Sequence, residues 1–164
     1  MRGVNISCDM HELTDFCNRV NESLSAEYRR EFYKACAKEL AARMLALVIP
    51  RTPVGVYPEG SGKVGGTLRR GWTAKGNDSK GNGDVAGFLD GLEVTENEGT
   101  YTVTLANPVE YAQYVEYGHR TRGGKGWVPG RFMMTISAAD VQKMAPQVLE
   151  RKLEKFLREG MGDK

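Results

Sequence analysis

One stretch of helical periodicity, between Ser25 and Pro50, constrains the fold more than any other feature of the sequence. Apolar side chains recur there at spacings of three and four residues, the period of one face of a helix. They are Tyr28, Phe32, Cys36, Leu40, Met44 and Leu47. Five alanines between residues 35 and 46 add helix propensity. The sequence therefore predicts a long helix from about Ser25 to Ile49, ended by Pro50, which lacks a backbone donor.

The residues before this helix predict two smaller elements. Val4-Asn5-Ile6 alternates as a short strand does, and Asp9 is a residue type that caps helices. We expect a brief strand and then a helix over about residues 9 to 22. The apolar face of that helix consists of Leu13, Phe16, Cys17 and Val20.

The composition changes sharply after the long helix. Residues 51–66 are rich in glycine and proline, which leaves little regular structure, and a loop of this length is usually functional. The 164 residues are most simply one domain, 1–164, with loop insertions at about 51–66 and 119–127 and a frayed end at about 160–164.

Alternating patterns between residues 67 and 106 predict strands. Thr67–Lys75 places Leu68, Trp72 and Ala74 on one face, although Arg70 interrupts it. Val85–Thr95 and Thr100–Ala106 follow, joined by a turn at residues 96–99. Two or three such strands form a small antiparallel sheet. We expect an α+β fold in which the long N-terminal helix, a short tyrosine-rich helix and a C-terminal helix cover this sheet.

Tyrosines at a spacing of three define the short helix. Tyr111, Tyr114 and Tyr117 fall on one side of it, Asn107-Pro108 precedes it, and Gly118 ends it. Tyrosine buries a large ring while keeping a polar tip, which suits a subunit interface. The alternative is that all three are ordinary residues covering the sheet.

A second open loop follows the tyrosines and carries positive charge. Arg120, Arg122, Lys125 and Arg131 form a basic patch with Trp127 beside it. A C-terminal helix is then predicted over about Ser137–Glu159, with a kink or a new helix at Pro146.

The sequence offers little for catalysis or metal binding. Three cysteines and two histidines occur, and a zinc set of Cys8, His11, Cys17 and Cys36 lacks the usual short ligand spacing. Glu110 and Glu116 point in different directions on a helix, so both are expected to be solvated or salt-bridged. We expect no catalytic residue, no metal and no cofactor. No apolar run approaches the roughly 18 residues that cross a bilayer, and the net charge of +2 favours no partner.

Four segments in this order resemble the tailed-bacteriophage tail-component family. Its members are small neck proteins of the lambda minor tail protein Z type, which are associated with head–tail joining and tail completion. The segments are Thr52–Val54, Gly66–Trp72, Tyr111–His119 and Gly130–Met134. The resemblance covers about residues 25–160. One departure is that Gly55–Gly65 separates two segments that are nearly adjacent in family members.

The resemblance implies a non-enzymatic structural protein of the virion, assembled in the host cytoplasm without a membrane. It implies a homo-oligomeric ring, sixfold or twelvefold, between the portal complex and the tail tube. The expected partners are the connector or stopper, the tail terminator and the tail tube, with DNA passing transiently through the lumen. Candidate interface residues are Tyr57, Lys63, Arg69, Arg70, Tyr111, Tyr114, Tyr117, His119, Arg120, Arg122, Trp127 and Arg131.

Two other classes of function stay open from the sequence. The first is a nucleic-acid-binding module that uses the basic loop at 119–131 and Trp127. The second is a metal-dependent or hydrolytic enzyme, for which the cysteines would be the starting point.

Overall fold

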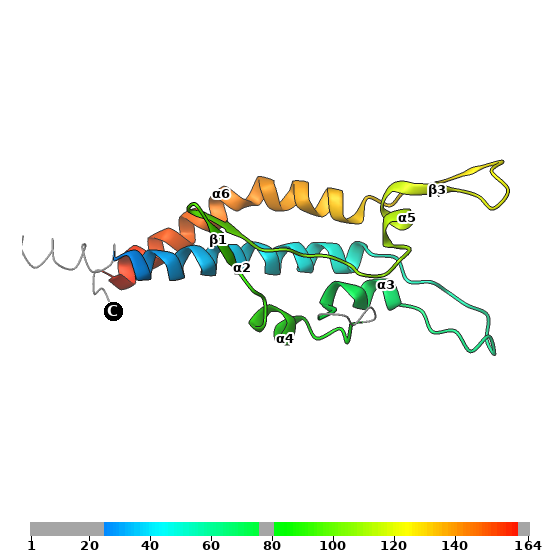
Figure 1. Ribbon diagram of the computed structural model, residues 1–164, viewed down its shortest axis with the longest axis horizontal. Helices are drawn as coiled ribbons and strands as arrows, with labels where there is room; N and C mark the ends of the chain where they lie inside the picture. The colour runs from blue at the N-terminus through cyan, green and yellow to red at the C-terminus, as the bar shows by residue number, and fades with distance from the viewer. Residues whose placement is uncertain (1–24, 76–80, 161–164) are drawn as a thin grey trace, which may run out of the picture.

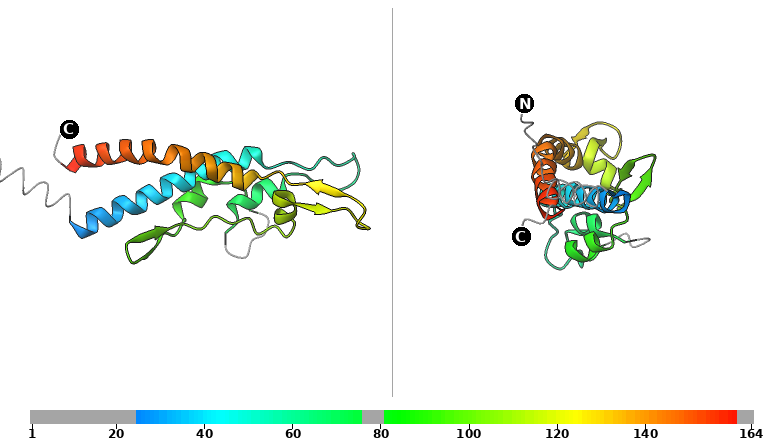
Figure 2. Two further views of the ribbon diagram at one scale, coloured as in Figure 1. Left: turned by 90° about the horizontal axis from the view of Figure 1, so that it is seen from above. Right: turned by 90° about the vertical axis from the view of Figure 1, so that its left-hand side faces the viewer.

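Two long antiparallel helices, α2 (Ala26–Arg51) and α6 (Met133–Gly160), lie side by side and form the body of the molecule (Figures 1 and 2). The computed structural model describes residues 25–75 and 81–160. The strand predicted at 4–6, the helix predicted at 9–22 and the expected frayed C-terminus lie outside these described residues.

Helix α2 confirms the prediction drawn from the apolar periodicity. Ser25 caps it, because its hydroxyl oxygen accepts a hydrogen bond from the Tyr28 backbone N–H at 3.3 Å. The prediction that Pro50 ends the helix is wrong, since Pro50 lies inside the last turn. A proline there removes only one backbone bond, and the helix ends where the Thr52 N–H donates to the Val48 and Ile49 carbonyls.

The two segments predicted as the first strands are mainly helical. Residues 67–75 contain α3 (Thr67–Arg70) and the 3₁₀ turn η1 (Gly71–Thr73), and residues 85–95 begin with α4 (Val85–Asp90). The buried Leu68 and Trp72 are four residues apart, which is the spacing of a helix face and not of a strand. Asp84 caps α4 by accepting a hydrogen bond from the Gly87 N–H at 3.0 Å. The strand prediction for both segments was therefore wrong.

The α+β class is confirmed, but the strands form two separate antiparallel hairpins among the described residues. β1 (Thr95–Asn97) pairs with β2 (Thr100–Thr102) across a turn formed by Glu98 and Gly99. β3 (Gly118–Arg120) pairs with β4 (Trp127–Pro129). The strand predicted over 100–106 ends at Thr102, but its alternation holds, because Tyr101, Val103 and Leu105 are half-buried and the residues between them are exposed.

Helix α6 starts four residues before the predicted Ser137 and passes through Pro146 as one helix. A new helix at Pro146 was thus a wrong expectation. Its C-terminal half turns towards the start of α2 (Figure 1). There the Phe156 ring lies 4.4 Å from the ring centroids of Tyr28 and of Phe32.

The buried core lies where the second half of α2 meets the shorter elements. Its members are Leu45, Val48, Leu68, Trp72, Phe88, Val109 and Met133. These residues come from α2, α3, η1, α4, the segment before the tyrosine helix, and the first turn of α6. The core therefore fixes the end of the body from which the two longest excursions of the chain leave.

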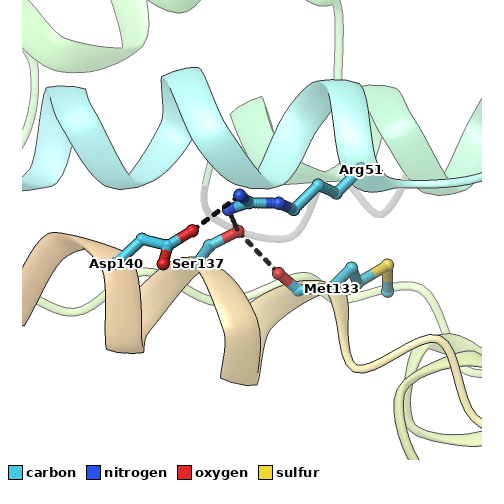
Figure 3. Close-up of polar contacts among 4 residues, drawn as sticks. All are labelled: Arg51, Met133, Ser137 and Asp140. Atoms are coloured by element: carbon cyan, nitrogen blue, oxygen red, sulfur yellow. Dashed lines mark hydrogen bonds and ion pairs between the residues drawn. The ribbon is translucent and has the colours of Figure 1, made fainter.

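Polar contacts tie the end of α2 to the start of α6 (Figure 3). The Arg51 guanidinium donates to the Asp140 carboxylate at 2.7 Å and to the Ser137 hydroxyl at 3.0 Å. The Ser137 hydroxyl in turn donates to the Met133 carbonyl at 2.6 Å. Ser137 is fully buried. These contacts therefore fix the position of α6 along α2 at this end.

Candidate functional site

Thr52, directly after α2, joins three segments through its own atoms. Its hydroxyl donates to the Val48 carbonyl and accepts from the Trp72 indole N–H, each at 2.7 Å. Its carbonyl accepts two hydrogen bonds from the Arg69 guanidinium, at 2.7 Å and 3.1 Å. Thr52 is fully buried and Trp72 nearly so. The Thr52–Val54 and Gly66–Trp72 segments of the sequence are therefore partners in one structural junction.

Residues 52–66, here called the proline–glycine loop, leave the body from this junction. At its base the Gly55 and Gly65 backbones are in contact, and a Cβ on Gly65 would collide with the Gly55 carbonyl oxygen. The Arg70 guanidinium donates to the Gly65 carbonyl at 3.3 Å. Beyond that base the loop projects from the body (Figure 1), and Val56 is 93% exposed. The base is fixed and the far part is free to make contacts.

The three predicted tyrosines lie on the outer side of helix α5 (Ala112–Tyr117) and of its N-cap residue. Tyr111 is that N-cap residue, and Tyr111, Tyr114 and Tyr117 are 44%, 52% and 63% exposed. Ala112 and Val115 pack on the core instead. The alternative that all three tyrosines cover a sheet is wrong for the described chain. The Tyr114 ring meets the His119 ring edge-on at 6.0 Å.

Glu116, on the inner side of α5, is buried and caps α6. Its carboxylate accepts hydrogen bonds from the Met134 and Thr135 backbone N–H groups, each at 2.9 Å, and from the Thr135 hydroxyl at 2.7 Å. A carboxylate at a helix N-terminus satisfies donors that lack helical partners and favours the helix dipole. The prediction of a solvated or salt-bridged Glu116 was wrong, because the sequence placed the start of α6 too late to reveal its partner.

Residues 118–131, here called the basic hairpin, replace the predicted open loop. Pairing of β3 with β4 leaves only residues 121–126 at the tip. The tip is closed by the Thr121 N–H donating to the Gly126 carbonyl at 2.9 Å. Gly118 has φ of 87°, where a Cβ would also meet the Val128 carbonyl, so glycine is needed at this corner.

The structure separates the candidate interface residues into two groups. Arg69 and Arg70 are half-buried and donate to carbonyls of the proline–glycine loop, so they hold its base. The others are exposed in this chain. They are Tyr57, Lys63, Tyr111, Tyr114, Tyr117, His119, Arg120, Arg122, Trp127 and Arg131. The proline–glycine loop and the basic hairpin leave the same end of the body, as both side views show (Figures 1 and 2).

The described residues contain no group of three His, Cys, Asp or Glu side chains placed to hold a metal ion. Cys36 is buried on α2, and burial raises the pKa of its thiol, with Lys152 opposing and Glu39 adding to the shift. Cys8, His11 and Cys17 lie outside the described residues. Within the described ranges, no helix is long and apolar enough to span a bilayer.

The described residues thus form a fixed helical body from which an exposed loop and an exposed hairpin project. A scan against protein families matches residues 14–118 to the family described as "Bacteriophage HK97-gp10, putative tail-component". The match spans more than half of the chain, and the chain therefore belongs to this bacteriophage tail-component family. The predicted tailed-phage resemblance is confirmed. The curated proteins give no match, and neither do the solved structures.

The matched range covers the residues that build the junction. It begins before the predicted start at residue 25 and ends at Gly118. Thr52, Trp72 and Glu116 lie inside it, whereas most of the basic hairpin and all of α6 lie beyond its end. Membership implies a structural role in the virion tail, where this chain contacts other tail proteins.

Proposed function

We propose that this tail component is a ring-forming subunit of the phage neck, which joins head and tail or completes the tail between the portal complex and the tail tube. A sixfold or twelvefold ring of identical copies is the proposed form. A head-to-tail ring uses two different surfaces of each subunit. The ring closes when the rotation between successive copies adds up to a full turn.

The observation that carries this proposal is the pair of projections at one end of a fixed body. Apolar side chains on them lie in solvent, with Val64 79%, Trp127 60% and Val128 40% exposed. Exposed aromatic and aliphatic side chains on a projecting element are typical of surfaces that become buried by a partner. The proposed partners are further copies of this chain and the connector, terminator and tail-tube proteins, met in the host cytoplasm during assembly.

Negative-stain imaging of phage that lack this protein tests the proposal. We expect full heads and separate tails, with joined particles restored when the wild-type chain is supplied from a plasmid. Normal joined particles in its absence would contradict a neck role.

A shortened proline–glycine loop gives a second test, in which residues 56–64 are deleted and Gly55 is joined to Gly65. Because these glycines already touch, the body should fold with a free energy of unfolding within about 1 kcal/mol of wild type. We expect the yield of joined particles to fall at least tenfold. Thermal unfolding and plaque counts measure the two effects.

A matched control keeps the length of the loop and removes its side chains, by replacing residues 56–64 with a glycine–serine segment of equal length. If assembly depends on side chains such as Val56 and Tyr57, this variant should fail as the deletion does. Normal joining by both variants would show that the loop is dispensable, and loss of folding in the deletion would show that it supports the body.

The basic hairpin favours a second candidate function, binding of single-stranded nucleic acid by charge and by stacking on Trp127. It predicts that the purified chain binds DNA with an affinity that falls steeply with salt, and that Trp127→Ala weakens this binding. A neck subunit through which DNA passes should bind DNA weakly, because tight contacts would obstruct ejection.

A further inference from the structure

Positive and negative charges are separated along the second half of the chain. Residues 81–118 contain seven Asp and Glu and no Lys or Arg. Residues 119–139 contain four Lys and Arg and no Asp or Glu. Glu116 is buried and the other six acidic residues are exposed, so these two ranges give the described surface an acidic region and a basic region.

The basic region is the basic hairpin. Arg120, Arg122 and Lys125 are exposed there, and within the described part of the chain none of them pairs with a carboxylate. Trp127 stands beside them with 60% of its surface exposed. An exposed tryptophan among arginines is the composition of an interface anchor, since Trp and Arg dominate binding hot spots.

The acidic region contains a groove. It has a volume of about 450 Å³ and lies between α4 and the extended residues 93–106. Its lining combines apolar side chains such as Phe88 and Leu92 with three threonines and with the opposite charges of Glu93 and Lys75. Glu98 is exposed in the adjoining β1–β2 turn. We name it the acidic groove, because most of its lining comes from residues 81–118, which contain no Lys or Arg.

Three cations close to the acidic groove are held by other groups, and the first is Lys38, whose ammonium donates to the Asp90 carbonyl at 3.3 Å. The Lys75 ammonium lines the groove and donates to the Gly87 carbonyl at 2.6 Å, a neutral acceptor that fixes the ammonium and leaves its charge in place. Arg30 pairs with Glu96 at 3.0 Å. Glu93 and Glu98 form no ion pair among the described residues. A basic partner would therefore meet Glu93 inside the groove and Glu98 in the adjoining turn.

The basic hairpin and the acidic groove of one copy are far apart. Both side views place the hairpin at one end of the long axis, and place α4 and β1 well back along the body (Figures 1 and 2). A hairpin anchored to α5 and α6 at its base cannot reach its own groove. The basic hairpin and the acidic groove carry charges of opposite sign and do not contact each other within one copy. They therefore fit a contact between successive copies.

We propose that the basic hairpin of one copy docks into the acidic groove of the next copy around the ring. Trp127 occupies the groove, and Arg120 and Arg122 face Glu93 and Glu98 of the neighbouring copy. The contact is heterologous, as a head-to-tail ring requires, and its charge complementarity fixes which surfaces meet. This inference rests on the proposed ring, and it names the surfaces that close that ring.

Charge reversal and its rescue test the contact. A hairpin variant carries Arg120→Glu and Arg122→Glu, and a groove variant carries Glu93→Lys and Glu98→Lys. Each alone places like charges together and should weaken self-association at least about tenfold. The chain with all four changes restores opposite charges between copies, so its association should return to within about threefold of wild type. Sedimentation velocity measures self-association, and plaque counts measure joining.

The matched control for the hairpin variant is the α6 variant Lys143→Glu with Arg151→Glu, which makes the same change of charge at exposed positions away from both surfaces. It should assemble as wild type does. Thermal unfolding of each variant confirms that the body stays folded, since all the changed residues are exposed.

The outcomes separate this inference from the proposed function. If the reversed variants assemble and join normally, or if the four-change chain is not rescued, the docking is wrong while the neck role stands. Loss of salt-dependent DNA binding in the hairpin variant, with assembly unchanged, would assign the hairpin to nucleic acid and also overturn the docking. Another outcome is that heads and tails join normally in phage without the protein, while charge reversal still weakens self-association and the four-change chain still restores it. In that case the docking holds and the neck role fails.

Discussion

Replacing Trp72 by alanine is expected to lower the free energy of unfolding by about 3 to 5 kcal/mol, the largest effect of any single change considered for this chain. Trp72 is 3% exposed and packs in the core with Leu68 and Val109. Its indole N–H also donates to the Thr52 hydroxyl at 2.7 Å, so the change leaves both a cavity and a buried hydroxyl with one partner fewer. Urea unfolding followed by circular dichroism measures the loss.

Trp127→Ala is the matched control for this prediction, because it removes the other tryptophan of the chain from an exposed position. We expect its free energy of unfolding to stay within about 0.5 kcal/mol of wild type. Joining of heads and tails should nevertheless fall in this variant. Equal destabilisation by the two changes would mean that the core is not centred on Trp72.

Glu116→Ala is expected to cost about 2 to 4 kcal/mol, because hydrogen bonds to charged groups contribute roughly 1.5 to 3 kcal/mol and a helix cap about 1. The change leaves the Met134 and Thr135 N–H groups at the start of α6 without their carboxylate partner. It also loosens the base of the basic hairpin, since Phe132 and Arg131 donate to carbonyls of α5. Thermal unfolding measures the stability, and hydrogen exchange of Met134 and Thr135 measures the loss of the cap.

Glu110→Ala provides the control, because Glu110 lies just before α5, the helix that contains Glu116, but is exposed. Its expected effect is within about 0.5 kcal/mol. If Glu116→Ala were as mild as Glu110→Ala, with unchanged exchange at Met134, the capping role of the Glu116 carboxylate would be wrong.

Periodicity was sufficient for the existence of the two long helices, whereas the α+β class is correct although two of the three predicted strands are mainly helical. The Ser25–Leu47 pattern extends over many turns, and burying one face of such a helix dominates its stability. Helical spacing is also present between residues 67 and 92, where strands were predicted. Leu68 and Trp72 are four apart, and Phe88 and Leu89 lie three and four residues after Val85. Short runs of this kind fit a strand or a helix until the packing partners are known.

The contacts that hold the candidate surface could not be predicted from the sequence, because they join residues far apart in the chain. Arg69 was predicted as a possible interface residue, yet its guanidinium reaches back to the Thr52 carbonyl. Glu116 was predicted in solvent, yet it caps a helix whose start lies 17 residues further along the chain, at Met133. Neither local composition nor spacing specifies such pairs. The exposure of Tyr114 and Trp127 likewise became known only from the structure, because it depends on which aromatic side chains pack in the core.

A cryo-electron microscopy reconstruction of the neck of the intact virion tests the central claim most directly. We expect a closed ring of copies of this chain between the portal complex and the tail tube, with residues 118–129 of each copy against the α4 surface of the next. A neck that lacks this chain would contradict the account, as would a ring whose basic hairpins all point away from neighbouring copies.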